Sequence, residues 1–120
     1  MSKTVGPTIA AWDGKAALRA AGGDPSFLAE LVNIYLKDAA RGIARIRRLE
    51  RQERFEDIGN EAHRLKGASL TLRLDGLGAA CRDIEEAARM KSAPLVAERT
   101  ALFKTGLEAF SRYWAGRVSA

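Results

Sequence analysis

Residues 55–72 read FEDIGNEAHRLKGASLTL, and the spacing of their apolar and small side chains decides the fold. These side chains recur at steps of three and four residues, which gathers them on one face of an α-helix. They are Phe55, Ile58, Ala62, Leu65, Ser69 and Leu72. The stretch therefore predicts a helix over residues 55–72 that turns one face to a core.

His63 is the one histidine of the chain, and it lies away from that face. At 100° per residue it falls about 130° from the middle of the apolar stripe, so it faces solvent or a partner. Gly59 and Gly67 lie one turn away on either side of it. A glycine inside a helix costs about 1 kcal/mol relative to alanine, so we expect the pair to serve clearance, letting another protein's backbone approach the imidazole.

The chemistry that suits this position is phosphoryl transfer through nitrogen. A neutral imidazole has a free nucleophilic nitrogen near neutral pH, and the phosphoramidate that it forms is reactive enough to pass its phosphoryl group on. Lys66, three residues further along, would neutralise phosphate oxygens as a point charge. The alternative is a surface histidine beside an ordinary solvated lysine.

Glu85 is the candidate partner for the second ring nitrogen. The next predicted helix covers residues 75–90, and Glu85 falls about 50° from the centre of its apolar stripe. That stripe consists of Leu74, Leu77, Cys81, Ile84 and Ala88. A carboxylate so close to a core needs a donor, and the ring N–H of His63 could supply it. Arg82 and Arg89 are the alternative partners of Glu85.

Residues 62–86 resemble the signature of the histidine-containing phosphotransfer (HPt) domain family, which runs His-x-Leu-Lys-Gly-x-Ser before a leucine-rich helix with Cys and an Ile-Glu pair. The matching positions are His63, Leu65, Lys66, Gly67, Ser69, Leu77, Cys81, Ile84 and Glu85. The stretch from Gly22 to Asp38 is similar to the family's first long helix, so the likeness covers about residues 12–90. One departure is Arg73, which stands where the family usually has glycine.

The resemblance implies a helical bundle that relays phosphate between aspartates of receiver domains, with His63 as the carrier. The family's polar partner to the histidine maps onto Glu85. The surface that would dock receiver domains then comprises Gly59, Arg64, Gly67, Leu70 and Arg73. The implied partners are the receiver domains of hybrid sensor kinases and response regulators. The catalytic divalent metal is expected in the receiver, and we expect the chain itself to bind no cofactor or metal.

Helical spacing continues along the rest of the chain. The pattern predicts a short helix over about residues 13–21, and then a helix capped by Asp24 with Pro25 at its first position. The stripe shifts near residues 39–42, and Ile43 begins a further helix to about Arg54. A last helix starts at Ser92 and Pro94 and carries apolar residues as far as Trp114. We expect an all-α fold, an antiparallel up-down four-helix bundle with an additional short N-terminal helix.

Composition fits one small domain over residues 1–120, with residues 1–8 as a flexible tail. At 120 residues and 47% hydrophobic content the chain can bury one core. It has no apolar run near 18 residues, and its first residues lack the apolar stretch of a signal peptide, so we expect a cytoplasmic protein. We also expect a monomer. The lone Cys81 is interpreted as a small buried side chain rather than a reactive thiol. Ser69 is interpreted as a packed small residue, and the aromatic residues are assigned to packing.

A net charge of +5 raises a different class of function, a basic helical nucleic-acid-binding or adaptor protein without phosphotransfer. The basic cluster comprises Arg41, Arg45, Arg47, Arg48, Arg51 and Arg54. Acidic residues alternate with it and no aromatic residue interrupts it, which favours a solvated helix face. Basic residues near His63, such as Arg64, Lys66 and Arg73, could instead speed encounter with acidic receiver domains. The sequence has no glycine-rich phosphate loop, so we expect a phosphocarrier and not an ATP-dependent kinase.

Overall fold

The structure is a computed structural model that describes residues 12–119, with side chains described as far as residue 117. It contains five helices, α1 (Gly14–Ala20), α2 (Pro25–Arg51), α3 (Phe55–Thr71), α4 (Asp75–Arg89) and α5 (Ala93–Ser119). No strand occurs within residues 12–119, which confirms the all-α prediction. The predicted tail over residues 1–8 lies outside the described residues.

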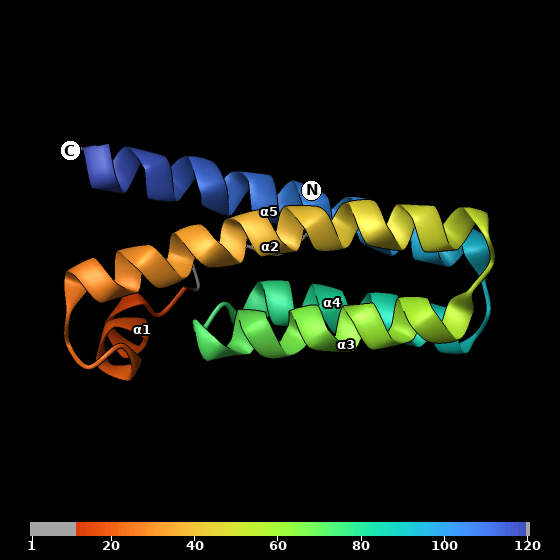
Figure 1. Ribbon diagram of the computed structural model, residues 1–120, viewed down its shortest axis with the longest axis horizontal. Coiled ribbons are helices and arrows are strands. Elements are labelled where there is room, and N and C mark those ends of the chain that lie inside the picture. The colour runs from red at the N-terminus through yellow and green to blue at the C-terminus, as the bar shows by residue number, and fades with distance from the viewer. Residues whose placement is uncertain (1–11, 120) are drawn as a thin grey trace, which may run out of the picture.

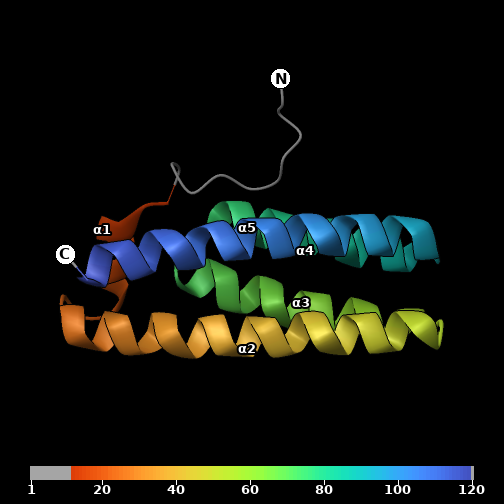
Figure 2. The ribbon, with the colours of Figure 1, turned by 90° about the horizontal axis from the view of Figure 1, so that it is seen from above.

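The four long helices lie side by side in two pairs (Figure 1). Helices α2 and α5 form the upper pair in this view, and α3 and α4 form the lower one. Each helix of one pair packs against a helix of the other, α2 against α3 and α5 against α4. The short α1 contacts α2 at the end where α2 begins, as the view from above also shows (Figure 2). Grooves lie between α3 and α4 and between α2 and α5.

Helix α2 corrects one prediction, because it is continuous over residues 25–51 where the sequence suggested a change of helix near residues 39–42. Ala39 and Gly42 are buried, so the apolar stripe drifts around the helix without interruption. A Cβ atom added at Gly42 would lie 2.8 Å from Cδ1 of Leu65. The glycine therefore allows α2 and α3 to approach closely, and it does not end a helix.

The start of α2 follows the predicted cap. The carboxylate of Asp24 accepts hydrogen bonds from the backbone N–H groups of Ser26 and Phe27, and Pro25 occupies the first helical position. These bonds satisfy donors that the first turn of a helix leaves free. The cap fixes where α2 begins.

Helix α3 ends in a left-handed residue at Arg73, whose φ is +61°. The N–H of Leu74 donates to the carbonyl of Ser69 at 2.9 Å, and the N–H of Arg73 donates to Leu70 at 3.0 Å, which is a Schellman motif. Only glycine adopts this conformation without a steric penalty. The motif therefore favours glycine at residue 73, and the structure shows that arginine still ends the helix there.

We expect Arg73→Gly to stabilise the fold by about 0.5–1 kcal/mol, because it relieves the left-handed strain at the cost of some unfolded-state entropy. Denaturant unfolding measures the change. Arg73→Ala is the matched control, since it removes the same exposed side chain and keeps the strain. A glycine variant no more stable than the alanine variant would show that the backbone at residue 73 stores no strain.

The core fills the space between the two helix pairs. Its largest fully buried side chains include Ile46, Ile58, Leu65, Ile84, Phe103 and Phe110. Ser69 is fully buried, as predicted, and its hydroxyl donates to the carbonyl of Leu65 at 2.9 Å while it also bonds the Tyr35 hydroxyl at 2.7 Å. Cys81 is buried too, and burial raises the pKa of its thiol to about 12, so the thiol stays protonated at neutral pH. This confirms its interpretation as a small buried side chain.

The aromatic side chain of Trp12, which precedes α1, packs against the bundle. Trp12 meets Phe110 edge-on with 5.0 Å between ring centroids, and its indole N–H donates to the carbonyl of Leu72 at 2.8 Å. That bond satisfies a free carbonyl at the end of α3.

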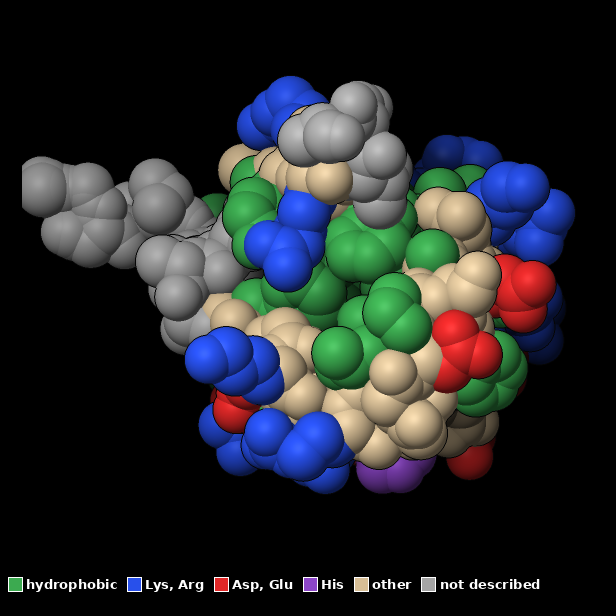
Figure 3. Space-filling view, turned by 90° about the vertical axis from the view of Figure 1, so that its left-hand side faces the viewer, with side chains coloured by type: hydrophobic (Ala, Val, Ile, Leu, Met, Phe, Trp, Pro, Cys, Tyr) green, Lys and Arg blue, Asp and Glu red, His purple; other side chains and the backbone are tan. Residues whose placement is uncertain are grey.

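Hydrophobic side chains also gather on the surface of the end that carries α1, with basic side chains around them (Figure 3). The aromatic residues therefore serve packing, as predicted.

Candidate functional site

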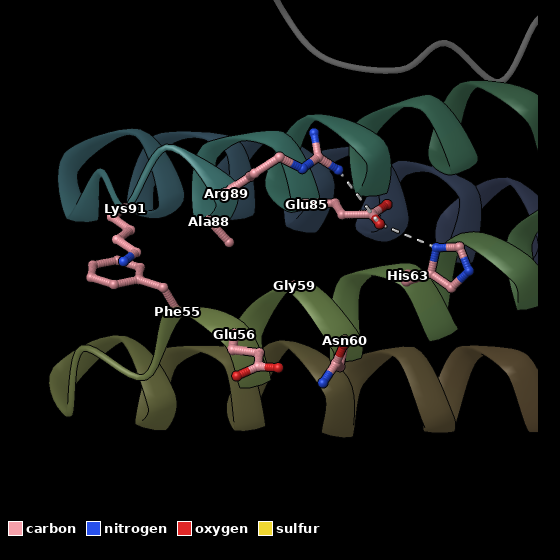
Figure 4. Close-up of a pocket in the computed structure, with 9 residues that line it drawn as sticks. All are labelled: Phe55, Glu56, Gly59, Asn60, His63, Glu85, Ala88, Arg89 and Lys91. Carbon is pink, nitrogen blue, oxygen red and sulfur yellow. Dashed lines mark ion pairs between the residues drawn. The ribbon is translucent and has the colours of Figure 1, made fainter.

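His63 projects from α3 toward the neighbouring helix α4, with 65% of its side chain exposed. Its Nδ1 atom lies 3.2 Å from Oε2 of Glu85, so the predicted contact between the two side chains is present. Figure 4 shows the ring with Nδ1 turned to the carboxylate and its other nitrogen, Nε2, turned away. With Nδ1 as the donor to Glu85, the lone pair of Nε2 faces outward.

Glu85 is the centre of a small charged cluster. Its side chain is 20% exposed, and besides His63 it contacts Nζ of Lys66 at 3.5 Å and Nη2 of Arg89 at 4.0 Å. Arg89, one of the alternative partners, therefore shares the carboxylate with His63 and does not replace it. Arg82, the other alternative, lines a separate hollow with Lys66 and Leu70. The carboxylate holds both the imidazole and the lysine in place.

Lys66 is three-quarters buried and lies one turn from His63 on α3. In the structure its ammonium group pairs with Glu85, which places a positive charge beside the imidazole. Lys66 and His63 therefore contact different oxygen atoms of the same carboxylate.

The two glycines beside His63 differ in their surroundings. A Cβ atom added at Gly67 would meet nothing within 4 Å, whereas one at Gly59 would lie 3.9 Å from Cβ of Ala88. Neither position needs glycine for the packing of this fold. The open space over Gly67 agrees with the clearance that the sequence suggested.

A groove of about 530 Å³ runs from His63 between α3 and α4 (Figure 4). Its lining residues are Phe55, Glu56, Gly59, Asn60, His63, Glu85, Ala88, Arg89 and Lys91. The lining combines apolar side chains with both signs of charge. The groove gives a partner protein a surface beside the imidazole.

The other predicted docking residues lie in different places. Leu70 is 43% exposed and covers Gly78 of α4, where an added Cβ atom would lie 2.7 Å from its Cδ2. Arg64 turns to α2, where its guanidinium lies 2.9 Å from Asp38 and 2.6 Å from Glu61. Hydrogen bonds to Glu61 and Asp38 raise the pKa of Arg64 still further above its usual range. The structure therefore gathers His63, Lys66, Glu85 and the two glycines, and it turns Arg64 to α2.

Glu61 is a residue that sequence reasoning missed. It is only 8% exposed, and it accepts hydrogen bonds from Arg64 and lies 3.6 Å from Arg45 of α2. Its place three residues after Ile58 and four before Leu65, at the edge of the apolar stripe, could have indicated burial. These ion pairs link α3, the helix that carries His63, to α2.

Two absences hold for the described residues. Within residues 12–117 no group of three or more His, Cys, Asp and Glu side chains could hold a metal ion. None of the five helices, as far as they are described, is long and apolar enough to cross a membrane.

Comparison with known proteins gives one match. The family model described as the Hpt domain matches residues 30–113, from the first turns of α2 to the last third of α5. Searches of curated proteins and of solved structures found no match.

Proposed function

The chain belongs to the Hpt domain family, and from this premise we propose that it carries a phosphoryl group on His63 between aspartates of receiver domains. One observation supports the proposal above the others. The imidazole is exposed, and its Nδ1 is held 3.2 Å from Glu85, which leaves Nε2 as the free nucleophile.

The proposed transfer is an in-line displacement at phosphorus. The lone pair of Nε2 attacks the phosphorus of a receiver aspartyl phosphate, the bond from phosphorus to the aspartate oxygen breaks, and the carboxylate leaves. The proton on Nδ1 stays on the ring, which becomes cationic, and the carboxylate of Glu85 offsets that charge. The reverse sequence delivers the phosphoryl group to the next aspartate.

Lys66 would neutralise the phosphoryl oxygens during both steps. We propose that the divalent metal and the remaining stabilisation of the transition state come from the receiver domain. Hpt domains are phosphocarrier modules rather than kinases, and we extend that role to this chain, without ATP-dependent kinase activity of its own.

The proposal includes the partners and the surface that meets them. We propose that receiver domains of hybrid sensor kinases and response regulators dock over Gly59, Gly67 and Leu70, beside the groove between α3 and α4. Arg73 would lie at the end of this surface. We also propose that the four long helices form an antiparallel up-down bundle and that the protein is a cytoplasmic monomer.

A panel of phosphorylated receiver domains tests the function. Each is incubated with the protein, and transfer of label is followed over time. We expect at least one receiver to lose its label to the protein within seconds to minutes. If every receiver keeps its label while transferring it to an established phosphotransfer protein, the proposed function is wrong.

We expect Glu85→Gln to slow phosphoryl transfer several-fold, and Glu85→Ala to slow it at least about tenfold. The glutamine amide can still accept a bond from Nδ1, but it cannot offset the charge of the phosphorylated ring. Single-turnover transfer from a phosphorylated receiver measures both rates. Glu86→Gln, on the exposed neighbour in α4, is the matched control and should transfer at the normal rate. Equal rates for all three variants would remove Glu85 from the mechanism.

A further inference from the structure

A second groove lies across the bundle from His63, between α2 and α5. Its volume is about 530 Å³. Its lining residues are Ala40, Ile43, Ala44, Arg47, Arg48, Arg51, Lys104, Leu107 and Glu108. In Figure 1 its two helices form the upper pair, whereas the helices that carry His63 and Glu85 form the lower one. A molecule bound in this groove would leave the imidazole free.

The groove is strongly basic. Four of its lining side chains are cationic, Arg47, Arg48, Arg51 and Lys104, and one, Glu108, is anionic. The sequence pattern favoured a solvated helix face for the basic cluster, but its arginines differ in their surroundings. Arg45 and Arg54 pair with Glu61 and Asp57, whereas within residues 12–117 none of the four groove cations takes part in an ion pair. Their charge is therefore available to a ligand.

The floor of the groove is apolar. Ile43 and Leu107 are buried at its base, and Ala40 and Ala44 are exposed along α2 at a spacing of one turn. Small side chains at this spacing leave a channel along the helix, and the arginines stand beside it. Apolar floor and cationic rim together fit a ligand that has an apolar face with negative charge at its edges.

We propose that this groove binds an amphipathic helix of a protein partner whose apolar face is flanked by acidic residues. A helix lying along two others buries its apolar side chains between them, which is a common mode of peptide recognition. Nucleic acid fits less well, because the lining residues include no aromatic side chain for base stacking and a phosphate backbone gains nothing from an apolar floor. The partner would be held on the side opposite His63, so it could stay bound while a receiver docks.

A synthetic peptide tests the proposal on the whole 120-residue chain. The probe is a fluorescein-labelled helical peptide with leucines at i, i+3, i+4 and i+7 and glutamates on both sides of that stripe. Fluorescence anisotropy measures its affinity for the protein. We expect saturable binding that the double variant Arg48→Glu and Arg51→Glu weakens at least about tenfold. The same charge change on α1, Lys15→Glu and Arg19→Glu, should alter the affinity by less than about twofold.

Two further measurements separate a built groove from simple charge attraction. Ala44→Gln narrows the channel without changing its charge and should also weaken binding, whereas a peptide of the same composition with scrambled order should bind poorly. The proposal is overturned if the scrambled peptide binds as well as the probe, if Ala44→Gln has no effect, or if an oligonucleotide of equal charge binds more tightly. Circular dichroism confirms that each variant is folded. Phosphoryl transfer to His63 should persist in all of them, so failure here is distinct from failure of the phosphocarrier role.

Discussion

The variant His63→Gln should accept no phosphoryl group from any receiver while keeping the stability of the parent protein. The chain has no other imidazole, so the substitution removes both ring nitrogens that could form a phosphohistidine. Because 65% of the His63 side chain is exposed, its loss should cost little packing. Glu85 also contacts Lys66 and Arg89, and we expect it to keep those contacts in the variant. Label transfer and thermal unfolding measure the two parts of this expectation.

Asn33→Ala is the matched control for that experiment. Asn33 is exposed on α2, and it does not line the groove beside His63. We expect the control to be labelled at a rate close to that of the parent. Acid-labile label retained by His63→Gln would place the acceptor on another residue.

Gly67→Leu should slow phosphoryl transfer at least about tenfold without destabilising the fold. The added side chain projects into open space one turn from His63, where we propose that the receiver's backbone approaches. Leucine has a better helix propensity than glycine, so the free energy of unfolding should rise by up to about 0.8 kcal/mol. Transfer kinetics and denaturant unfolding measure the two effects.

Gly116→Leu is the matched control, because it makes the same substitution far along the chain from His63. Gly116 also lies in a helix with nothing within 4 Å of an added Cβ atom, but it lies near the end of α5. It should show the gain in stability and no loss of transfer rate. If both glycine variants transfer phosphate at the parent rate, clearance over Gly67 is not a docking feature.

Local sequence patterns predicted much of the fold. Steps of three and four residues placed α3, α4 and α5, because each buries a single continuous stripe. The cap at Asp24 followed from side-chain chemistry within four residues of sequence. The same helical geometry placed Glu85 near the edge of its apolar stripe, where a carboxylate needs a donor, and His63 lies within reach of it.

Features that depend on distant residues were not predicted. The stripe of α2 drifts at Ala39 and Gly42, and only the approach of Leu65 from α3 shows that the helix continues there. Glu61 pairs with Arg45, which lies sixteen residues earlier on another helix. The basic residues at 47, 48 and 51 line a groove only because α5 brings Lys104 and Leu107 beside them. The periodicity of one segment gives no information about which residues of other helices pack against it.

The position of the phosphoryl group on the ring tests the central claim most directly. The chain contains one histidine, so protein labelled with ¹⁵N in its imidazole gives a single set of ring signals. NMR is recorded before and after transfer from a phosphorylated receiver. Because Nδ1 is held by Glu85, the account predicts phosphorus coupling at Nε2 of His63 and a proton retained on Nδ1. An unmodified ring in labelled protein, or phosphorus on Nδ1, would contradict it.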